Sequence, residues 1–324
     1  MRNFLKITCS NAARACALAF VFFPLLCGKT FAATPDWSPI QTALNANGTE
    51  MPGNVLRFEL ARQDLAVTVN GQAVPPTEVA AVTNGFIAFK PSGKAQFFVD
   101  GSLPAQETEV AALQASLRQN KQIQITAIAG RVIQESPKLV WVHFEANGNG
   151  ANLAASLATA LATIHSPQVG VTVIPGTNSV INPSSILPAQ FLKLFDEGFV
   201  EQFTDIFAFY LPRPDEKRIF LGDTRAEPGL GVGQSFYIQF SFSGGTTATM
   251  NIDFALRANE IQAVEDTLRA GGFTITSQTN NFTGSFPELY FVHVTGSGDG
   301  LTLGNTLFSA IQMIQNNSQG GHNF

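Results

Sequence analysis

The sequence has little cysteine, and what it has is confined to one end. The 324-residue chain contains three cysteines, Cys9, Cys16 and Cys27, all within its first 27 residues. If that segment is removed on export, the remaining chain has no thiol. This excludes disulfides, thiol redox chemistry and cysteine-bound zinc from the mature protein.

Charge is also scarce, because only 13% of the residues are Asp, Glu, Lys or Arg. Four of the 19 basic residues lie before Ala33, which leaves 15 against 24 acidic residues and a net charge of −9. Binding to nucleic acid or anionic lipid requires clustered Lys and Arg, so neither is an expected partner. The 45% hydrophobic content is typical of a compact globular protein.

The first 32 residues have the pattern of a signal peptide. A basic start precedes the apolar stretch Ala15–Leu26, and Thr30–Ala32 resembles a small-x-small cleavage site. The apolar stretch is shorter than the roughly 20 residues that span a bilayer, so we expect no transmembrane segment. The mature chain is predicted to begin near Ala33 and to be periplasmic or secreted. Lipid anchoring at Cys27 is the less favoured alternative, because Leu26 stands where a small residue is usual.

The sequence aligns with itself at a shift of 150 or 151 residues. Val55–Asp64 aligns with Ile206–Asp215, and the pair shares a Phe, a Leu, an Arg and an Asp at matching positions. Glu109–Arg118 aligns with Glu260–Arg269 in the same way. Repeated matches at a nearly constant shift indicate an internal duplication.

The duplication sets the predicted domain boundaries. Residues 1–32 form the signal peptide, residues 33–165 the first copy and residues 188–316 the second copy. The segment 166–187 is rich in Pro and Asn and is predicted to be the linker. Residues 317–324 are predicted to be a flexible tail.

Periodicity indicates mixed secondary structure in each copy. Apolar and polar residues alternate in Thr247–Phe254, which predicts a half-buried strand. Apolar residues recur at i, i+3 and i+7 in a helix of each copy, which predicts a face packed on a sheet. These positions are Val110, Leu113 and Leu117, and Ile261, Val264 and Leu268. A short amphipathic helix is expected to open each copy, at Trp37–Leu44 and Pro188–Glu197.

A hairpin is expected late in each copy. Its arms are Ile123–Ile133 and Lys138–Glu145 in the first copy, and Phe273–Thr279 and Glu288–Thr295 in the second. A turn rich in Gly and Asn and a helix of small residues follow. The predicted fold class is therefore α+β, with two tandem domains that each contain an antiparallel sheet with helices packed on it.

Two of the four histidines, His143 and His293, occupy the same position in the two copies. On strand alternation each shares a face with an aromatic residue, Trp141 or Phe291. One interpretation is a functional site, and the other is a hydrogen-bonded structural residue, since buried polar groups are normally paired. Because they belong to the same strand of separate copies, the two histidines need not share a site.

The chain resembles the bacterial LppY/LpqO-type proteins, also called the DUF1259 family, over nearly its whole mature length. The matching features are Arg62 and Asp64, Gly85–Gly93, Glu109-Val110, Ile125–Ala127, and Trp141 with His143. The family is uncharacterised. Its typical members carry His-Asn-His just after Ile-Thr-Ala, and that resemblance implies a metal or acid-base site with the strand histidine.

This chain departs from the family pattern at the His-Asn-His positions. They fall on Ala129, Gly130 and Arg131 in the first copy, and on Thr279, Asn280 and Asn281 in the second. We therefore predict no metal site and no cofactor, and a lost or altered site on a retained fold.

The remaining candidates are one arginine and several carboxylates, and all of them except Asp253 recur in both copies. Glu109 and Glu260 stand where helices begin, so stabilisation of first-turn amides is their ordinary role. Arg62 and Asp64 are ordinarily a surface or inter-strand ion pair. Asp253 stands seven residues before Glu260 and corresponds to Ser102 in the first copy. The catalytic candidates are His293, Glu260 and Asp253, and the binding candidates are His143, Glu109, Arg62, Asp64, His293 and Glu260.

Three functions remain open. The preferred hypothesis is a non-catalytic module that binds a small molecule, a glycan or an envelope protein, either between the copies or on the sheet face with the histidines. The alternative is a metal-assisted or acid-base hydrolase using Glu260, His293 and Asp253. A purely structural envelope component is the third.

Overall fold

A computed structural model describes residues 35–319, apart from residues 63, 70, 75–78, 165–173, 176–198, 204–205 and 241–245. The predicted signal peptide, the predicted helix Pro188–Glu197, most of the predicted linker and His322 lie outside the described residues. Residues from Pro35 onward belong to one compact unit. Within the described part, no helix is both long and apolar enough to cross a lipid bilayer.

Two large antiparallel sheets repeat one strand order, which confirms the predicted fold class. The first sheet has the order β1-β2-β5-β6-β9-β7, and the second has the order β10-β11-β12-β15-β16-β19-β17. From β11 onward each strand of the second sheet has a counterpart in the first. The strand β10 (Ile174–Pro175) is additional, and it lies within the segment predicted to be the linker.

The strands of the first sheet are β1 (Thr49–Met51), β2 (Val55–Ala61), β5 (Asn84–Gly93), β6 (Gln96–Gln106), β7 (Ile123–Ala129) and β9 (Leu139–Asn149). Those of the second sheet after β10 are β11 (Phe199–Phe203), β12 (Ile206–Leu211), β15 (Gln234–Phe240), β16 (Thr247–Leu256), β17 (Thr274–Thr279) and β19 (Tyr290–Asp299). Two small sheets consist of β3 (Thr68–Val69), β4 (Gln72–Ala73) and β8 (Glu135–Ser136), and of β13 (Phe220–Leu221), β14 (Thr224–Arg225) and β18 (Ser285–Phe286).

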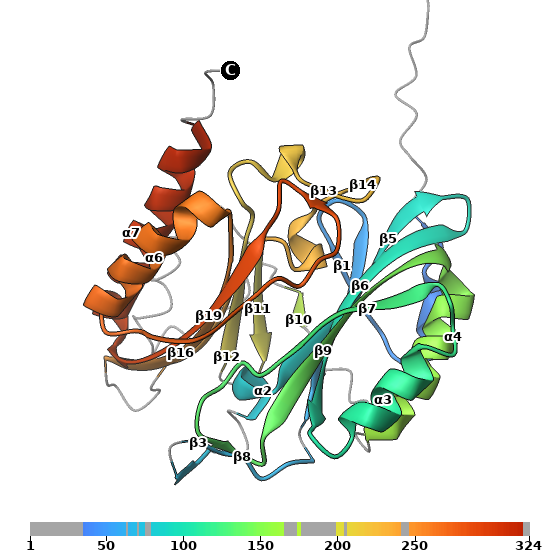
Figure 1. Cartoon of the computed structure of the whole chain (residues 1–324), viewed down its shortest axis with the longest axis horizontal. Helices are drawn as coiled ribbons and strands as arrows, with labels where there is room; N and C mark the ends of the chain where they lie inside the picture. The colour runs from blue at the N-terminus through green and yellow to red at the C-terminus, as the bar shows by residue number, and fades with distance from the viewer. Residues whose placement is uncertain are drawn as a thin grey trace, which may run out of the picture. The chain divides into compact units, whose positions relative to one another are not determined.

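Helices cover one face of each large sheet. In Figure 1, α3 and α4 lie along the first sheet, and α6 and α7 lie along β16 and β19 of the second. The helices are α1 (Ser38–Leu44), α2 (Val79–Val82), α3 (Val110–Leu117), α4 (Gly150–Leu161), α6 (Ala258–Ala270) and α7 (Gly300–Gln319), with short 3-10 turns η1 (Ala162–Ile164), η2 (Glu216–Arg218) and η3 (Pro228–Leu230). The predicted helix at the start of the first copy is confirmed as α1.

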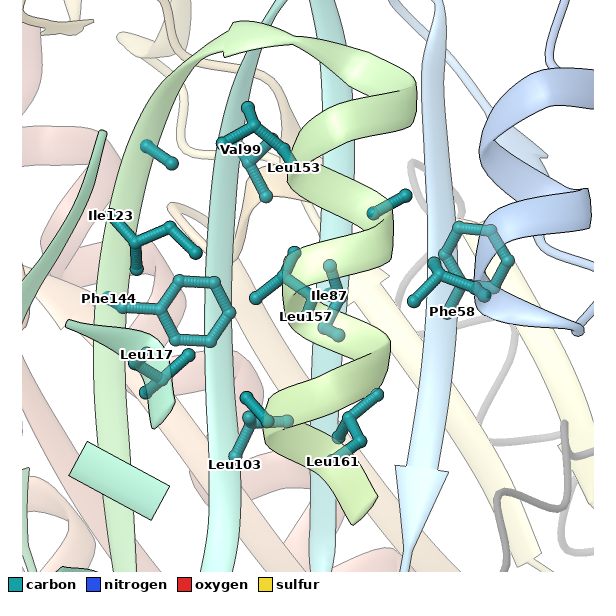
Figure 2. Packing of buried hydrophobic residues seen from close by; sticks show 14 of the residues in the cluster. Phe58, Ile87, Val99, Leu103, Leu117, Ile123, Phe144, Leu153, Leu157 and Leu161 are labelled. Atoms are coloured by element: carbon teal, nitrogen blue, oxygen red, sulfur yellow. The ribbon is translucent and has the colours of Figure 1, made fainter. Parts of the chain in front are cut away.

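Because side chains alternate along each strand, the two faces of each sheet contribute to different hydrophobic clusters. Leu153, Leu157 and Leu161 recur every fourth residue of α4 and point at the sheet, where Phe144 and Val99 meet them (Figure 2). The second copy has its own cluster of this kind. A third cluster combines residues of both copies from the opposite sheet faces, including Phe98 from β6, Tyr210 from β12 and Phe291 from β19. The two sheets therefore pack together through the faces that the helices leave open.

Three predicted elements end at other residues than expected. The Gly/Asn stretch after Glu145 was predicted to be a turn, but β9 continues through it to Asn149 and pairs with β6 along its whole length. Gly148 allows this because a Cβ there would lie 2.6 Å from the Gln122 amide. The first arm of the hairpin ends early, at Ala129. The helix α7 extends to Gln319, into the segment predicted to be the tail.

Candidate functional site

His143 and His293 line the same cavity. Their side chains project from β9 and β19 on the faces opposite the helices, where they are 4% and 3% exposed. Arg131 and Asp253 line the cavity with them. The expectation that the histidines need not share a site is wrong, because the two sheets pack on each other through the faces that carry them.

Asp253 is held against His293 by strand pairing. The two residues are register partners on β16 and β19, and Oδ1 of Asp253 contacts Nδ1 of His293. Ser102 is the register partner of His143 on β6 and β9. A β-bulge interrupts the neighbouring strand beside each histidine, between Ile275 and Ser277 in the second copy and at the matching place in the first.

Arg131 connects the two copies. It follows the last residue of β7 by two positions, outside the strand, and is 8% exposed. Its Nη2 donates to Ser102 Oγ at 3.0 Å in its own copy, and its Nη1 lies 3.4 Å from Asp253 Oδ2 in the other copy. The guanidinium carbon lies 5.1 Å from the centre of the Trp141 ring. The early end of β7 thus leaves Arg131 free to reach across the interface.

The charges around the cavity shift the pKa values of its titratable groups. Burial raises the pKa of Asp253, but its contact with the His293 ring and the positive charge of Arg131 outweigh burial and lower it to about 2. Burial lowers the pKa of His143 well below its usual value, and the Arg131 charge adds to this. Burial, with the nearby Glu145, raises the pKa of Asp100 well above its usual value. At neutral pH, Asp253 is ionised and His143 is neutral.

The ionised Asp253 fixes the tautomer of a neutral His293. A carboxylate only accepts hydrogen bonds, so Nδ1 of His293 must carry the hydrogen that lies between them. In the neutral ring Nε2 then has a lone pair and accepts a hydrogen bond. This is the arrangement in which a carboxylate orients an imidazole for binding or for proton transfer.

Three buried nitrogen atoms of these residues have no hydrogen-bond partner in the described part of the protein. They are Nε of Arg131, Nε2 of His143 and Nε2 of His293. Two adjacent hollows of about 20 Å³ each share Asn84, Arg131, Asp253 and His293. A hollow of about 10–15 Å³ admits one water. The site is therefore small and polar, with unused hydrogen-bonding capacity.

The predicted residues Arg62, Asp64 and Glu109 form a separate cluster. Nε of Arg62 binds Asp64 at 2.8 Å, and Nη1 binds Glu109 at 2.6 Å. Glu109 also accepts a hydrogen bond from the backbone of Gln106 at 2.8 Å, just before α3. Arg62 is 1% exposed, so this ion pair is buried rather than on the surface.

The second copy repeats that cluster with Arg213, Asp215 and Glu260. Nε of Arg213 binds Asp215 at 2.9 Å, and both Nη atoms bind Glu260 at 2.9 Å. Glu260 also accepts from the backbone nitrogen of Arg257 in a capping box at the start of α6. The structure therefore brings His293 and Asp253 together and places Glu260 in a buried arginine cluster. Across the described residues, no group of three or more His, Asp and Glu side chains is arranged to hold a metal ion.

Sequence reasoning missed Arg131, Arg57 and Asp100 as residues of the site. Arg57 and Asp100 line the cavity from β2 and β6. Arg57 stacks on Phe86, with 3.8 Å between the guanidinium carbon and the ring centre, and donates to the Gly229 carbonyl at 2.9 Å. Asp100 shares a face of β6 with Ser102, so alternation alone could have placed it near His143. No sequence signal predicted that Arg131 crosses to Asp253.

A family comparison matches both halves of the chain. Residues 38–163 and 195–313 match the family described as Domain of Unknown Function (DUF1259). The chain belongs to the DUF1259 family. The two matched segments correspond to the two copies, so this DUF1259 protein carries the domain twice, in agreement with the repeated sheet order.

Comparison of this DUF1259 protein with curated proteins gave no match. Solved structures that it matches include the trimeric bacterial microcompartment shell protein PduB, at 11% identity and a TM-score of 0.20, over 83% of this chain and 91% of that one. EtuB from Clostridium kluyveri matches at 10% identity and a TM-score of 0.20, over 84% of this chain and 92% of that one. The ethanolamine utilization protein EutL from Leptotrichia buccalis C-1013-b matches at 9% identity and a TM-score of 0.20, over 86% and 100%.

Proposed function

We propose that this DUF1259 protein is an exported module that binds a small polar ligand between its two copies. The cavity contains Arg131, His143 and His293, each more than nine-tenths buried. Each contributes a nitrogen without a protein partner in the described structure. Because buried polar atoms are almost always paired, a water or ligand is the expected partner of these three. This convergence of three such atoms on one cavity carries the proposal.

The position of the cavity also supports binding. Ligand sites occur preferentially where two structural units meet. Here Ser102 and Asp253, from different copies, both contact Arg131, so the site exists only when the copies are packed together. Tyr210 Oη donates to Glu59 Oε1 at 2.9 Å across the same interface. These residues are the counterparts of each other in the two copies, so the interface is nearly self-complementary.

A thermal-unfolding screen of the chain that begins at Ala33 tests the binding proposal. We expect some small polar molecules to raise the unfolding temperature of the wild type, and Arg131→Gln to abolish those shifts. Arg269→Gln is the matched control, because the Arg269 side chain is half exposed on α6 and does not line the cavity. If every hit survives in Arg131→Gln, or if no molecule is a hit and a protein co-purifies, the cavity is not the binding site.

Export is part of the proposal and rests on the composition of residues 1–32. Mass spectrometry of the protein isolated from its own cells identifies the first residue of the mature chain. We expect that residue to be Ala33, with the chain in the periplasm or the medium. A chain that begins with an acylated Cys27 would show membrane anchoring, and an intact N-terminus in the cytoplasm would contradict export.

The contact between Asp253 and His293 favours a second candidate function, acid-base hydrolysis. A carboxylate on Nδ1 orients the ring and leaves Nε2 able to take a proton from water. In this reaction His293 is the base and Asp253 its positioning residue, while Glu260 maintains the fold. Hydrolysis of a panel of activated esters and amides tests this role. Activity that His293→Gln abolishes and Arg269→Gln retains would support catalysis, and equal rates in all three proteins would exclude it.

A further inference from the structure

We propose that the cavity binds a small hydroxy acid, the size of glycolate, with its carboxylate on Arg131 and its hydroxyl group on His293. This inference rests on the proposed binding function and adds the chemical class of the ligand. It follows from the kind of hydrogen bond that each unpartnered nitrogen can make.

Nε of Arg131 needs a hydrogen-bond acceptor, and a negatively charged acceptor is the best match. Its Nη1 and Nη2 already face Asp253 and Ser102, and its Nε is buried without a partner in the described residues. An arginine nitrogen can only donate, and the guanidinium group stays charged in proteins. Hydrogen bonds from it to a carboxylate are stronger than those to a neutral oxygen. A carboxylate oxygen of the ligand is therefore the expected partner of Nε.

When the His293 ring is neutral, its Nε2 needs a hydrogen-bond donor as its partner. Asp253 contacts Nδ1, so the hydrogen of the ring is on that side and Nε2 presents a lone pair. A second carboxylate oxygen cannot satisfy this atom, because it has no hydrogen to donate. A hydroxyl group can. The ligand must therefore combine an acceptor for Arg131 with a donor for His293.

The other residues that line the cavity are compatible with a ligand that carries one negative charge. Arg57 and Arg131 bring positive charge to the lining, and Asp253 and Asp100 are its carboxyl groups. Burial raises the pKa of Asp100, which favours its neutral form and so reduces its repulsion of an incoming carboxylate. His143 is neutral, and its unpartnered Nε2 can donate or accept according to its tautomer.

The size of the cavity limits the ligand to a few atoms. The two hollows have about 20 Å³ each and share Arg131 and His293. Each holds one or two waters at about 10–15 Å³ per water. A two-carbon hydroxy acid can place its carboxylate in one hollow and its hydroxyl in the other, after displacing those waters.

Isothermal titration of the chain that begins at Ala33 with matched probes tests the inference. Glycolate has both groups, acetate lacks the hydroxyl, methoxyacetate lacks its hydrogen, and ethylene glycol lacks the carboxylate. We expect glycolate to bind about tenfold more tightly than acetate or methoxyacetate, the effect of one hydrogen bond in a buried site. Ethylene glycol should bind more weakly still. Arg131→Gln should lose most of the glycolate affinity, and Arg269→Gln should retain it.

The outcomes separate this inference from the proposed function. Equal affinities for acetate, methoxyacetate and glycolate would overturn the role of His293 and leave an anion site. Binding of other polar molecules but not glycolate, sensitive to Arg131→Gln, would overturn the hydroxy-acid class alone. No binding of any probe, with only ordered water in the cavity of the glycolate-soaked protein, would overturn both. Circular dichroism of each variant shows that lost affinity does not reflect lost folding.

Discussion

Asp253 and His293 are register partners on neighbouring strands, and the carboxylate Oδ1 of one contacts the imidazole Nδ1 of the other. Ser102 and His143 have the same register in the first copy. Only the second copy therefore has a carboxylate beside its histidine. Arg131 of the first copy approaches that carboxylate, so one asymmetric site has arisen from two equivalent positions.

Asp253→Asn is expected to destabilise the protein at neutral pH and much less in acid. The pKa of Asp253 is lowered from 3.8 to about 2, so its contribution is present above about pH 4 and is lost as the pH falls through about 2. The shift corresponds to about 2 kcal/mol. Urea unfolding of both proteins at pH 7 and pH 2.5 measures the difference. A gap of equal size at both pH values would mean that the ionised carboxylate is not the stabilising form.

Arg213→Met is expected to cost about 3–5 kcal/mol of folding free energy, because it leaves the buried Glu260 without its cation and leaves Asp215 with Arg257 alone. The double variant Arg213→Met, Glu260→Met should recover part of this loss. Urea unfolding measures both, and Arg269→Met is the control, because the Arg269 side chain is half exposed, in contrast to the fully buried Arg213. A single variant as stable as the control would show that this cluster does not support the fold.

Gly101→Ala is expected to destabilise the first sheet by about 1–3 kcal/mol, the usual cost of overpacking a core. A Cβ at Gly101 would lie 2.2 Å from the Phe144 ring, which is itself buried. Gly93→Ala is the matched control on the adjacent strand, because its Cβ would meet Gln96 Cβ at 3.6 Å, an ordinary contact. Thermal unfolding of the two variants compares them. Equal unfolding temperatures would contradict this packing of Phe144 on β6.

Glu216→Gln is expected to stabilise the protein at pH 8 and to change little at pH 5. Burial and the nearby Glu227 raise the pKa of Glu216 to about 7, and its Oε2 is buried without a partner in the described residues. A raised pKa means that stability is lost as the pH rises from about 4.5 through about 7. Because Glu216 is only partly buried, solvent screening reduces the gain from the neutral amide at pH 8 to about 1–2 kcal/mol.

Urea unfolding at pH 5 and pH 8 measures that gain. Glu107→Gln is the control, because Glu107 is exposed and its nearest lysine contact, Lys138 at 3.8 Å, is exposed as well. A benefit of Glu216→Gln that is the same at both pH values would contradict a titration between them.

The fold was largely predictable from the sequence. The patterns that identify its strands and helices lie within short segments and occur in both copies. The alternation of β16 and the i, i+3, i+7 pattern of α3 each identify a buried face, and the duplication supplied every such signal twice. The end of β9 was mispredicted, because Gly and Asn are typical of turns. In the folded chain Gly148 serves a different purpose, close contact with Gln122 beneath a paired strand.

The site was predictable only in part, because it depends on how the copies pack. Alternation placed each histidine on the strand face that carries Trp141 or Phe291, and in the structure these faces lie away from the helices. That those faces meet is a tertiary property that no strand pattern contains. Arg131 was noticed only as a residue that replaces a family histidine, since its approach to Asp253 spans 122 positions of sequence and becomes visible only in space.

The most direct test is the long-range proton-nitrogen NMR spectrum of the His293 ring, assigned by the loss of its signals in His293→Gln. We predict that in the neutral ring Nδ1 carries the hydrogen and Nε2 has the lone pair, and that glycolate shifts the Nε2 signal in the wild type but not in Arg131→Gln. A hydrogen on Nε2 of the free neutral ring, or an Nε2 signal that saturating glycolate leaves unchanged, would contradict this account of the site.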